Sequence, residues 1–240
     1  MSPTAPEPVT HVHPDAETLA EAVATRLAER VAAAQAEGRV PHVVLTGGTI
    51  AIEIYERLDV DAARWADVVY WFGDERFVPQ GHEDRNDRQA RDSFLDRCGV
   101  PAENVRSMPA HGCSTSMAEA ADAYGATLPD EPFDVVLLGL GPDGHVASLF
   151  PGFTQLHERE RRCVEVFGSP KPPPERISLT FGALNHTRAT WFLVSGEGKA
   201  DAVARARAGE GSIDETPARG AHGQDETLWF LDEAAASALR

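Results

Sequence analysis

Three short apolar runs in this sequence each end at a glycine, and this repeated pattern constrains the fold more than any other feature. The runs and their glycines are His42–Thr46 with Gly47, Val68–Phe72 with Gly73, and Asp134–Leu138 with Gly139. Short apolar runs bounded by turn residues are typical of strands buried on both faces of a parallel sheet. Segments with helical periodicity, such as the Ala-rich stretch 15–37, alternate with these runs. The alternation predicts an α/β, Rossmann-like fold with a doubly wound, mainly parallel sheet and helices on both faces.

The remainder of the chain continues this alternation, which favours one domain. We expect further strands at 163–167, 190–194 and 228–231, helices at 50–58, 86–96, 116–128 and 199–208, and a terminal helix that ends at Arg240. Residues 15–240 are therefore predicted to form a single α/β catalytic domain. Residues 1–14 begin with a Pro-rich segment and are predicted to be a flexible N-terminal lead-in.

Charge and composition argue against several classes of function. The formal net charge is −16, which is unfavourable for a nucleic-acid partner because nucleic acid is bound by a basic face. No apolar run approaches the roughly 20 residues that span a bilayer, so we expect no membrane partner. Three cysteines without a Cys-x-x-Cys pair favour a reduced, cytoplasmic setting, and the spacing of histidines and cysteines predicts no metal site. A bound phosphate would need local cations to overcome the overall negative charge.

In a doubly wound sheet, ligands bind outside the carboxyl ends of the strands, so the segments that follow strands are the candidate sites. The first such segment contains Gly47, Gly48 and Thr49 and opens a predicted helix. Glycines let the backbone approach a ligand closely, and the free N–H groups of a helix N-terminus suit a phosphate. The alternative is a tight turn with no function.

The second segment, 71–79, places charged residues directly after a buried strand. Arg76 is a candidate for bidentate phosphate binding, and Asp74 is a candidate for the catalytic set, where it would orient Arg76 or bind a sugar hydroxyl. The alternative is a solvated turn that contains an internal ion pair.

The third segment, 134–152, carries the candidate general base. Glycines at 139, 141 and 144 form a turn that delivers His145, and histidine titrates near neutral pH. Asp143 lies in the same turn and is included in the catalytic set. Ser148 lacks a nucleophile-elbow context and is interpreted as a hydrogen-bonding residue. The alternative is that His145 has only a structural role.

A fourth segment, 169–180, presents Lys171 and Arg176 in a Pro-rich and therefore stiff loop, which loses little entropy when it binds a ligand. These residues are candidates for substrate or phosphate binding, and Lys199 is a weaker one. The alternative is an exposed connector.

Four segments in this order resemble the 6-phosphogluconolactonase family, within the glucosamine/galactosamine-6-phosphate isomerase superfamily. They are 45–49, 73–79 with Asn86 downstream, 139–152, and 171–180. The resemblance implies a fold related to sugar-phosphate isomerases and hydrolysis of 6-phospho-D-glucono-1,5-lactone to 6-phospho-D-gluconate, in the oxidative pentose phosphate pathway. It implies no cofactor, a small sugar-phosphate partner and a monomer or weak homodimer. By position, His145 matches the catalytic histidine, Arg76 the active-site arginine, and Lys171 and Arg176 the basic substrate-binding loop.

Two departures from the family pattern stand out. The glycine turn continues as Thr49-Ile50-Ala51, where the family usually has Ser-x-Pro, and Arg85 replaces a serine that usually precedes Asn86. Thr49 keeps a hydroxyl, whereas Arg85 is expected to add a charge at the rim of the site.

Two other functions are alternatives to this one. A glucosamine-6-phosphate deaminase would share the Gly-Pro-Asp-Gly-His turn, but that family follows its histidine with an Asn-Glu-Pro segment, and here Ser148–Pro151 has no carboxylate. A non-catalytic sugar-phosphate sensor would usually adjoin a DNA-binding region and would not need His145.

Overall fold

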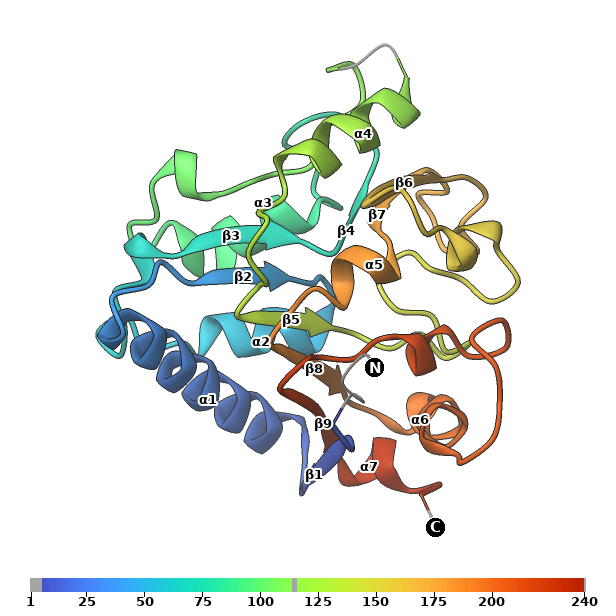
Figure 1. Cartoon of the computed structure of the whole chain (residues 1–240). Coiled ribbons are helices and arrows are strands. Elements are labelled where there is room, and N and C mark those ends of the chain that lie inside the picture. Colours follow the sequence, from blue (N-terminus) through green and yellow to red (C-terminus); the bar gives the residue numbers. More distant parts are fainter. Residues whose placement is uncertain (1–5, 114–115, 240) are drawn as a thin grey trace.

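The computed structural model describes residues 6–113 and 116–239, and these form a central sheet with helices on both faces (Figure 1). Within the described residues the sheet has six strands in the order β1-β9-β8-β5-β2-β3, and each neighbouring pair is parallel. The strands are β1 (Val9–His13), β2 (His42–Leu45), β3 (Val69–Phe72), β5 (Val135–Leu138), β8 (Ala189–Val194) and β9 (Glu226–Asp232). The predicted doubly wound parallel sheet is confirmed.

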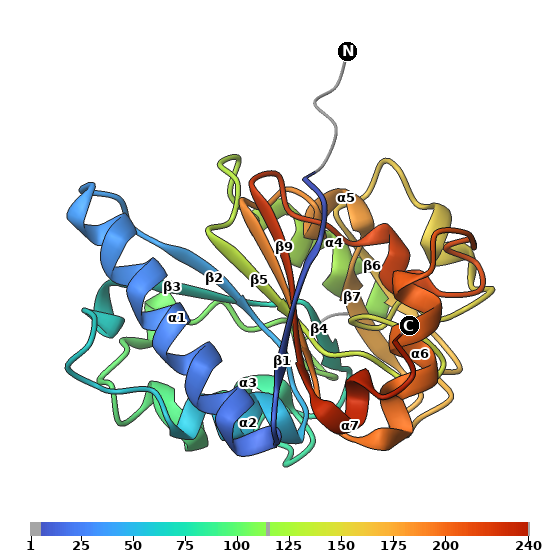
Figure 2. The same cartoon turned by 90° about the horizontal axis from the view of Figure 1, so that it is seen from below.

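The helices divide between the two faces of this sheet. They are α1 (Ala16–Ala36), α2 (Thr49–Glu56), α3 (Asn86–Ala90), α4 (Met117–Thr127), α5 (Phe181–Leu184), α6 (Ala200–Arg207) and α7 (Glu233–Ala236). Figure 2 shows α1 and α2 on one face, and α4, α5 and α6 on the other. Helix α1 begins where predicted, because Asp15 and Thr18 form a reciprocal capping box. It buries one apolar stripe against the sheet.

A second, antiparallel sheet packs beside α4 and was not predicted. It consists of β4 (Asp74–Arg76), β7 (Arg176–Leu179) and β6 (Cys163–Val166), in the order β4-β7-β6. The run at 163–167 therefore belongs to this sheet and not to the central one. Residues 176–179 belong to the segment that we expected to be a stiff, Pro-rich loop, yet they form a strand that is buried along its whole length. Its buried polar side chains are satisfied by hydrogen bonds, so the sequence of this strand does not show the apolar pattern by which buried strands are recognised.

The predicted boundaries differ from the structure mainly at the ends of the chain. The expectation of a flexible lead-in over 1–14 is wrong for Val9–His13, which pairs with β9 along its whole length. None of its five side chains is fully buried, so the strand needs no run of apolar residues. Residues 1–5 and Arg240, the expected end of the last helix, lie outside the described residues, and α7 already ends at Ala236. The predicted helix 86–96 is α3 followed by one π-helical turn, Arg91–Leu95.

The strand order reverses beside β2, and this reversal positions the site. The chain passes from β2 outward to β3 and later returns to β5 on the opposite side of β2. The turns that follow β2 and β5 therefore diverge at the carboxyl edge and leave a crevice between them, as expected at the topological switch point of an α/β sheet.

Candidate active site

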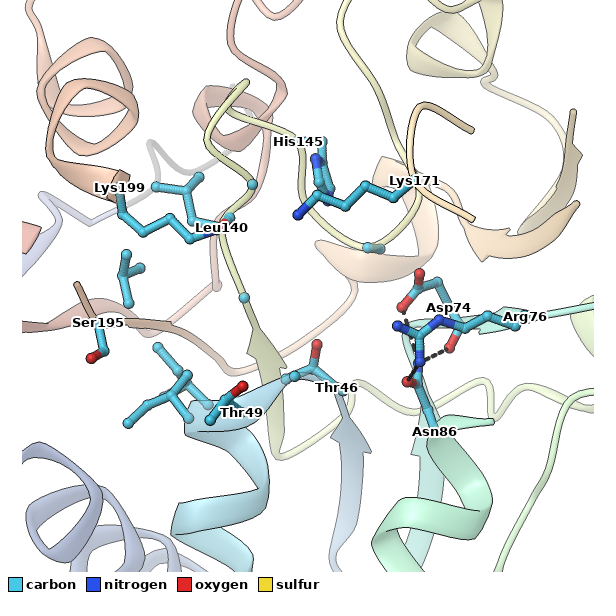
Figure 3. A pocket seen from close by; sticks show the side chains of 18 of the residues that line it. Thr46, Thr49, Asp74, Arg76, Asn86, Leu140, His145, Lys171, Ser195 and Lys199 are labelled. Carbon is cyan, nitrogen blue, oxygen red and sulfur yellow. Dashed lines mark hydrogen bonds between the residues drawn. The ribbon is translucent and has the colours of Figure 1, made fainter. Parts of the chain in front are cut away.

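A cleft of about 540 Å³ lies at this switch point. It is lined by the segments that follow β2, β3, β5 and β8 and by the loop before β7. All the sequence-predicted site residues except Asp143 line it, including Lys199, the weaker candidate, and the structure adds Asn86 and Ser195. Figure 3 shows Thr49, Ser195 and Lys199 on one side of the cleft and Asp74, Arg76 and Asn86 on the other. The structure therefore brings these residues together in one cleft, while their roles remain predictions.

His145 is held by Asp143, which lies behind it. The Nδ1 atom of His145 lies 2.5 Å from Oδ1 of Asp143, and the backbone N–H of His145 donates to the same oxygen at 3.2 Å. Burial raises the pKa of Asp143, but hydrogen bonds from His145 outweigh burial and hold the pKa below its ordinary value. The imidazole ring of His145 also packs against the ring of Phe150, with 4.6 Å between the ring centroids. An ionised Asp143 thus favours the tautomer with a proton on Nδ1 and leaves Nε2 of His145 as the basic nitrogen.

Glycine is required in the turn that delivers this histidine. A Cβ on Gly141 would overlap Nδ1 of His145. Gly144 has a φ of +91°, and a Cβ there would press on Thr216. The N–H groups of Gly141 and Gly144 donate to carbonyls within the turn, to those of His145 and Gly141 respectively.

Helix α6 holds the same turn from outside. The ammonium of Lys199, at the start of α6, donates to the carbonyl of Leu140 at 2.6 Å. Arg205, within α6, donates to the carbonyl of Pro142 at 3.0 Å. Burial, with repulsion from Lys171, lowers the pKa of Lys199. Lys199 therefore lines the cleft itself and also holds the turn that carries His145.

Asp74 and Ser148 form a buried pair at the base of the cleft. Ser148 Oγ donates to Asp74 Oδ2 at 2.5 Å, which supports the interpretation of Ser148 as a hydrogen-bonding residue. The guanidinium of Arg176 lies 3.8 Å from the same carboxylate oxygen. Asp74 is thus fixed between a hydroxyl and a cation, with little freedom to move.

Arg76 is fixed by Asn86, a residue that we did not include in the predicted site. Its Nη1 donates to Asn86 Oδ1 at 2.7 Å and to the carbonyl of Asp84 at 2.6 Å. The amide of Asn86 in turn donates to the carbonyl of Asp74 at 2.8 Å (Figure 3). The buried Nε of Arg76 has no hydrogen-bond partner among the described residues. The only sequence signal for Asn86 was its place in the segment that resembles the family.

The glycine turn after β2 has the conformation that the sequence predicted. Gly48 has a φ of +103° and precedes α2, which begins at Thr49. A Cβ on Gly47 would overlap the side chain of Asn86, so this glycine lets the turn and the Arg76–Asn86 pair meet. The first N–H groups of α2 have no partner within the helix.

The two cations of the Pro-rich segment differ in their settings. Arg176 is buried, and its Nε and Nη2 donate to the carbonyls of Pro173 at 2.7 Å and Lys171 at 3.0 Å. Burial lowers the pKa of this guanidinium, and Asp74 opposes the effect. Lys171 is exposed and lines the cleft. Arg176 thus holds the loop that carries Lys171.

The expectation that Arg85 adds a charge at the rim of the site is wrong. Arg85 is 1% exposed and does not line the cleft. Its guanidinium donates to both carboxylate oxygens of Asp87, at 2.9 and 3.0 Å, and to the carbonyl of Met108 at 2.7 Å. A buried arginine needs such partners, and they lie on the side away from the cleft.

Comparison with known proteins agrees with this geometry. A family model described as glucosamine-6-phosphate isomerases/6-phosphogluconolactonase matches residues 14–229. The chain belongs to this family. A 6-phosphogluconolactonase from Streptomyces coelicolor is 45% identical over 244 residues, which cover 95% of this chain and 93% of that protein. One from Mycobacterium tuberculosis is 41% identical over 240 residues, covering 95% and 97%.

A solved relative of this family has the same fold. The 6-phosphogluconolactonase of Trypanosoma brucei superposes with a TM-score of 0.84 at 26% identity, covering 98% of this chain and 99% of that one. Together with the curated relatives, it places the chain among the hydrolases of the family and not among its isomerases. Ser148, Leu149 and Phe150, where a deaminase would carry its carboxylate, are instead buried here.

Among residues 6–113 and 116–239, no group of three or more His, Cys, Asp or Glu side chains is arranged to hold a metal ion. Over the same residues, no helix has both the length and the apolar character needed to cross a bilayer.

Proposed function

We propose that this enzyme hydrolyses 6-phospho-D-glucono-1,5-lactone to 6-phospho-D-gluconate, with His145 as the general base, in the oxidative pentose phosphate pathway. The observation that carries the proposal is the contact between His145 and Asp143 at the edge of a cleft that is lined by four cations. A base opposite fixed positive charge suits hydrolysis of a phosphorylated ester. Relatives of 41–45% identity with lactonase names support the choice of substrate.

In the proposed reaction His145 acts twice. Nε2 takes a proton from water as the water oxygen attacks the lactone carbonyl carbon, which gives a tetrahedral oxyanion. Collapse of this intermediate breaks the bond to the ring oxygen, and the imidazolium returns its proton to that oxygen as a hydroxyl forms. Asp143 is a positioning residue that holds the ring and stabilises its charged form, as the carboxylate does in a catalytic triad.

The oxyanion needs a donor, and we assign this role to Arg76. Backbone N–H groups of the 141–145 turn are poor candidates, because those of Gly141, Gly144 and His145 already donate within the turn. Arg76 lines the cleft and is fixed by hydrogen bonds to Asn86 and to the carbonyl of Asp84. A donor that is fixed before the reaction costs no reorganisation when the charge develops.

The phosphate is assigned to the glycine turn and the two lysines of the cleft. Burial, with repulsion from Lys171, lowers the pKa of Lys199, and a dianion bound between the two lysines would relieve that repulsion. Gly47, Gly48 and Thr49 contribute backbone N–H groups at the start of α2. Arg176 acts through the loop that it holds, and not by direct contact with the phosphate.

The decisive experiment measures hydrolysis directly. The lactone is generated in situ, and its loss is followed with and without protein, because it also hydrolyses unaided. Ammonia release from glucosamine 6-phosphate is measured in parallel. Acceleration of lactone loss without ammonia supports the proposal, and a rate equal to the blank overturns it.

His145→Ala tests the role of the base. A positioned general base typically contributes about 10²–10⁴-fold, so turnover should fall by that order while the thermal unfolding temperature stays close to that of the wild type. Near-native turnover in the variant would remove His145 from the mechanism.

A further inference from the structure

The side chain of Glu75 lies on the opposite side of β4 from the cleft. Its neighbours in the strand, Asp74 and Arg76, both line the cleft, whereas Glu75 does not and is 1% exposed. Alternation along a strand accounts for this arrangement. A carboxylate is rarely buried without a specific set of partners, so the question is what it holds.

Glu75 accepts hydrogen bonds from three backbone N–H groups. Oε1 accepts from the N–H of Arg76 and of Asn86, both at 2.8 Å, and Oε2 accepts from the N–H of Asp87 at 3.0 Å. Asn86 and Asp87 open α3, where the N–H groups have no partner within the helix. The residue at the N-cap position is Arg85, whose side chain cannot accept a hydrogen bond. Glu75 therefore caps α3 from another element.

Arg85 supplies the charge that faces this carboxylate. One of its terminal nitrogens lies 3.8 Å from Glu75 Oε2, and both side chains are 1% exposed. Asp87, which accepts two hydrogen bonds from Arg85, is the third charged member of the cluster. Because removal of one partner from a buried pair leaves the other charge uncompensated, the two residues depend on each other.

The cluster connects to the cleft through Arg76 and Asn86. Glu75 fixes the backbone of both residues, and their side chains hydrogen-bond to each other at 2.7 Å. Asn86 also contacts the carbonyl of Asp74 and abuts Gly47. A shift of α3 relative to β4 would therefore move the guanidinium that faces the substrate.

We propose that Glu75 and Arg85 form a buried charge pair that positions Arg76 and Asn86 for the reaction. Neither residue touches the cleft, so both are positioning residues. The inference deepens the proposed function and rests on it, because it takes Arg76 as the group that meets the developing oxyanion. It also gives a role to Arg85, one of the two places at which this chain departs from the family pattern.

The test is a double-mutant cycle with Glu75→Gln and Arg76→Ala. The side-chain amide of this variant keeps one oxygen that can accept a hydrogen bond, but its N–H donors would face the N–H of Asp87 and the guanidinium of Arg85. The cap of α3 would therefore be disrupted. We expect kcat to fall about tenfold when Glu75→Gln is made in the wild type, and by less than about twofold when it is made in Arg76→Ala, because coupled residues are not additive. An equal loss in both backgrounds overturns the proposal, since general destabilisation would act in either.

Matched variants separate positioning from folding. Glu83→Gln makes the same change at an exposed glutamate of the loop before α3 and should leave kcat unchanged. Arg85→Met should reproduce the loss, and Arg85→Lys should restore part of it by keeping the charge. Wild-type kcat in Arg85→Met overturns the role of the pair and serves as the test if Glu75→Gln does not fold.

A binding measurement separates this inference from the proposed function. The same four proteins of the cycle are titrated with 6-phosphogluconate in a calorimeter. If the wild type fails to hydrolyse the lactone, the proposed function fails, but the coupling between Glu75 and Arg76 is still measured as a fold-change in Kd. Additive changes in Kd overturn the inference whether or not the lactone is the substrate.

Discussion

At the scale of single residues, the turn between Leu140 and His145 must bring Asp143 into contact with His145, and it can do so only where the backbone carries no side chain. Asp143 and His145 are two residues apart, and their side chains meet at 2.5 Å only because the chain folds back over Gly141. The carbonyls of Leu140 and Pro142 point outward to cations at the start of and within α6. The site thus depends on which positions in the turn lack a side chain.

Gly141→Ala tests this dependence, with Gly209→Ala as its control. A methyl group at 141 would overlap His145 Nδ1, whereas a Cβ at 209, an exposed position outside the cleft lining, has no neighbour within 4 Å. We expect Gly141→Ala to lower kcat by about 10²-fold or more, because the base is displaced. Gly209→Ala should stay within about twofold of the wild type. Lactone hydrolysis and thermal unfolding of both variants provide the comparison, and equal activities would contradict the steric argument.

At the scale of elements, the small antiparallel sheet organises the cations of the cleft. Strand β4 presents Asp74 and Arg76, and the neighbouring β7 begins with Arg176, whose guanidinium ties down the loop that carries Lys171. The prolines alone would restrict the conformations of this loop, but they would not fix its position relative to the cleft. The buried arginine provides that placement.

Replacement of Arg176 should therefore act through the loop. Arg176→Met keeps the length of the side chain but removes the hydrogen bonds to the carbonyls of Lys171 and Pro173. We expect KM to rise about tenfold with a smaller change in kcat, because the phosphate loses a positioned lysine. Arg159→Met, an exposed arginine before β6, is the control and should leave KM unchanged. A fall in kcat at constant KM would instead indicate direct contact with the reacting group.

The strands of the central sheet could be predicted from the sequence, whereas the small sheet and the residues that hold the site residues in place could not. Strands β2, β3 and β5 are apolar apart from His42 and are followed within two residues by a glycine, so local sequence is enough to find them. Strand β7 buries Arg176 and Ser178, whose hydrogen bonds with the folded Pro-rich loop and with the N–H of Ser148 cannot be recognised from the local sequence. The same reason explains Asn86 and Glu75, since their partners appear only after β4 and α3 have met. Edge strand β1 carries too few apolar residues to signal its pairing with β9.

At the scale of the whole molecule, the fold concentrates cations in a chain that carries a formal net charge of −16. Arg76, Lys171, Arg176 and Lys199 all line one cleft. Because the overall field repels an anionic substrate at long range, binding depends on these local charges. Behind them, the Glu75–Arg85–Asp87 cluster buries one cation with two carboxylates, an arrangement that carries a cost in stability.

This cost predicts a pH dependence of global stability. Burial raises the pKa of Glu75 from its ordinary 4.5 to about 7; Asp87 adds to this rise, whereas Arg85 and the N–H groups of Asn86 and Asp87 oppose it. Between these two values the folded protein binds more protons than the unfolded chain, so the contribution of Glu75 to the free energy of unfolding falls as pH rises through this window. Glu75→Gln lacks this contribution. The wild type should therefore lose on the order of 1–3 kcal/mol relative to the variant between pH 5 and pH 8.

Urea unfolding at both pH values measures this difference in the free energy of unfolding, and the contributions of the histidines cancel because both proteins contain them. Glu83→Gln, which alters an exposed carboxylate, should parallel the wild type. A difference between the wild type and Glu75→Gln that is the same at pH 5 and pH 8 would mean that Glu75 ionises alike in the folded and unfolded chains, contrary to its burial behind the site.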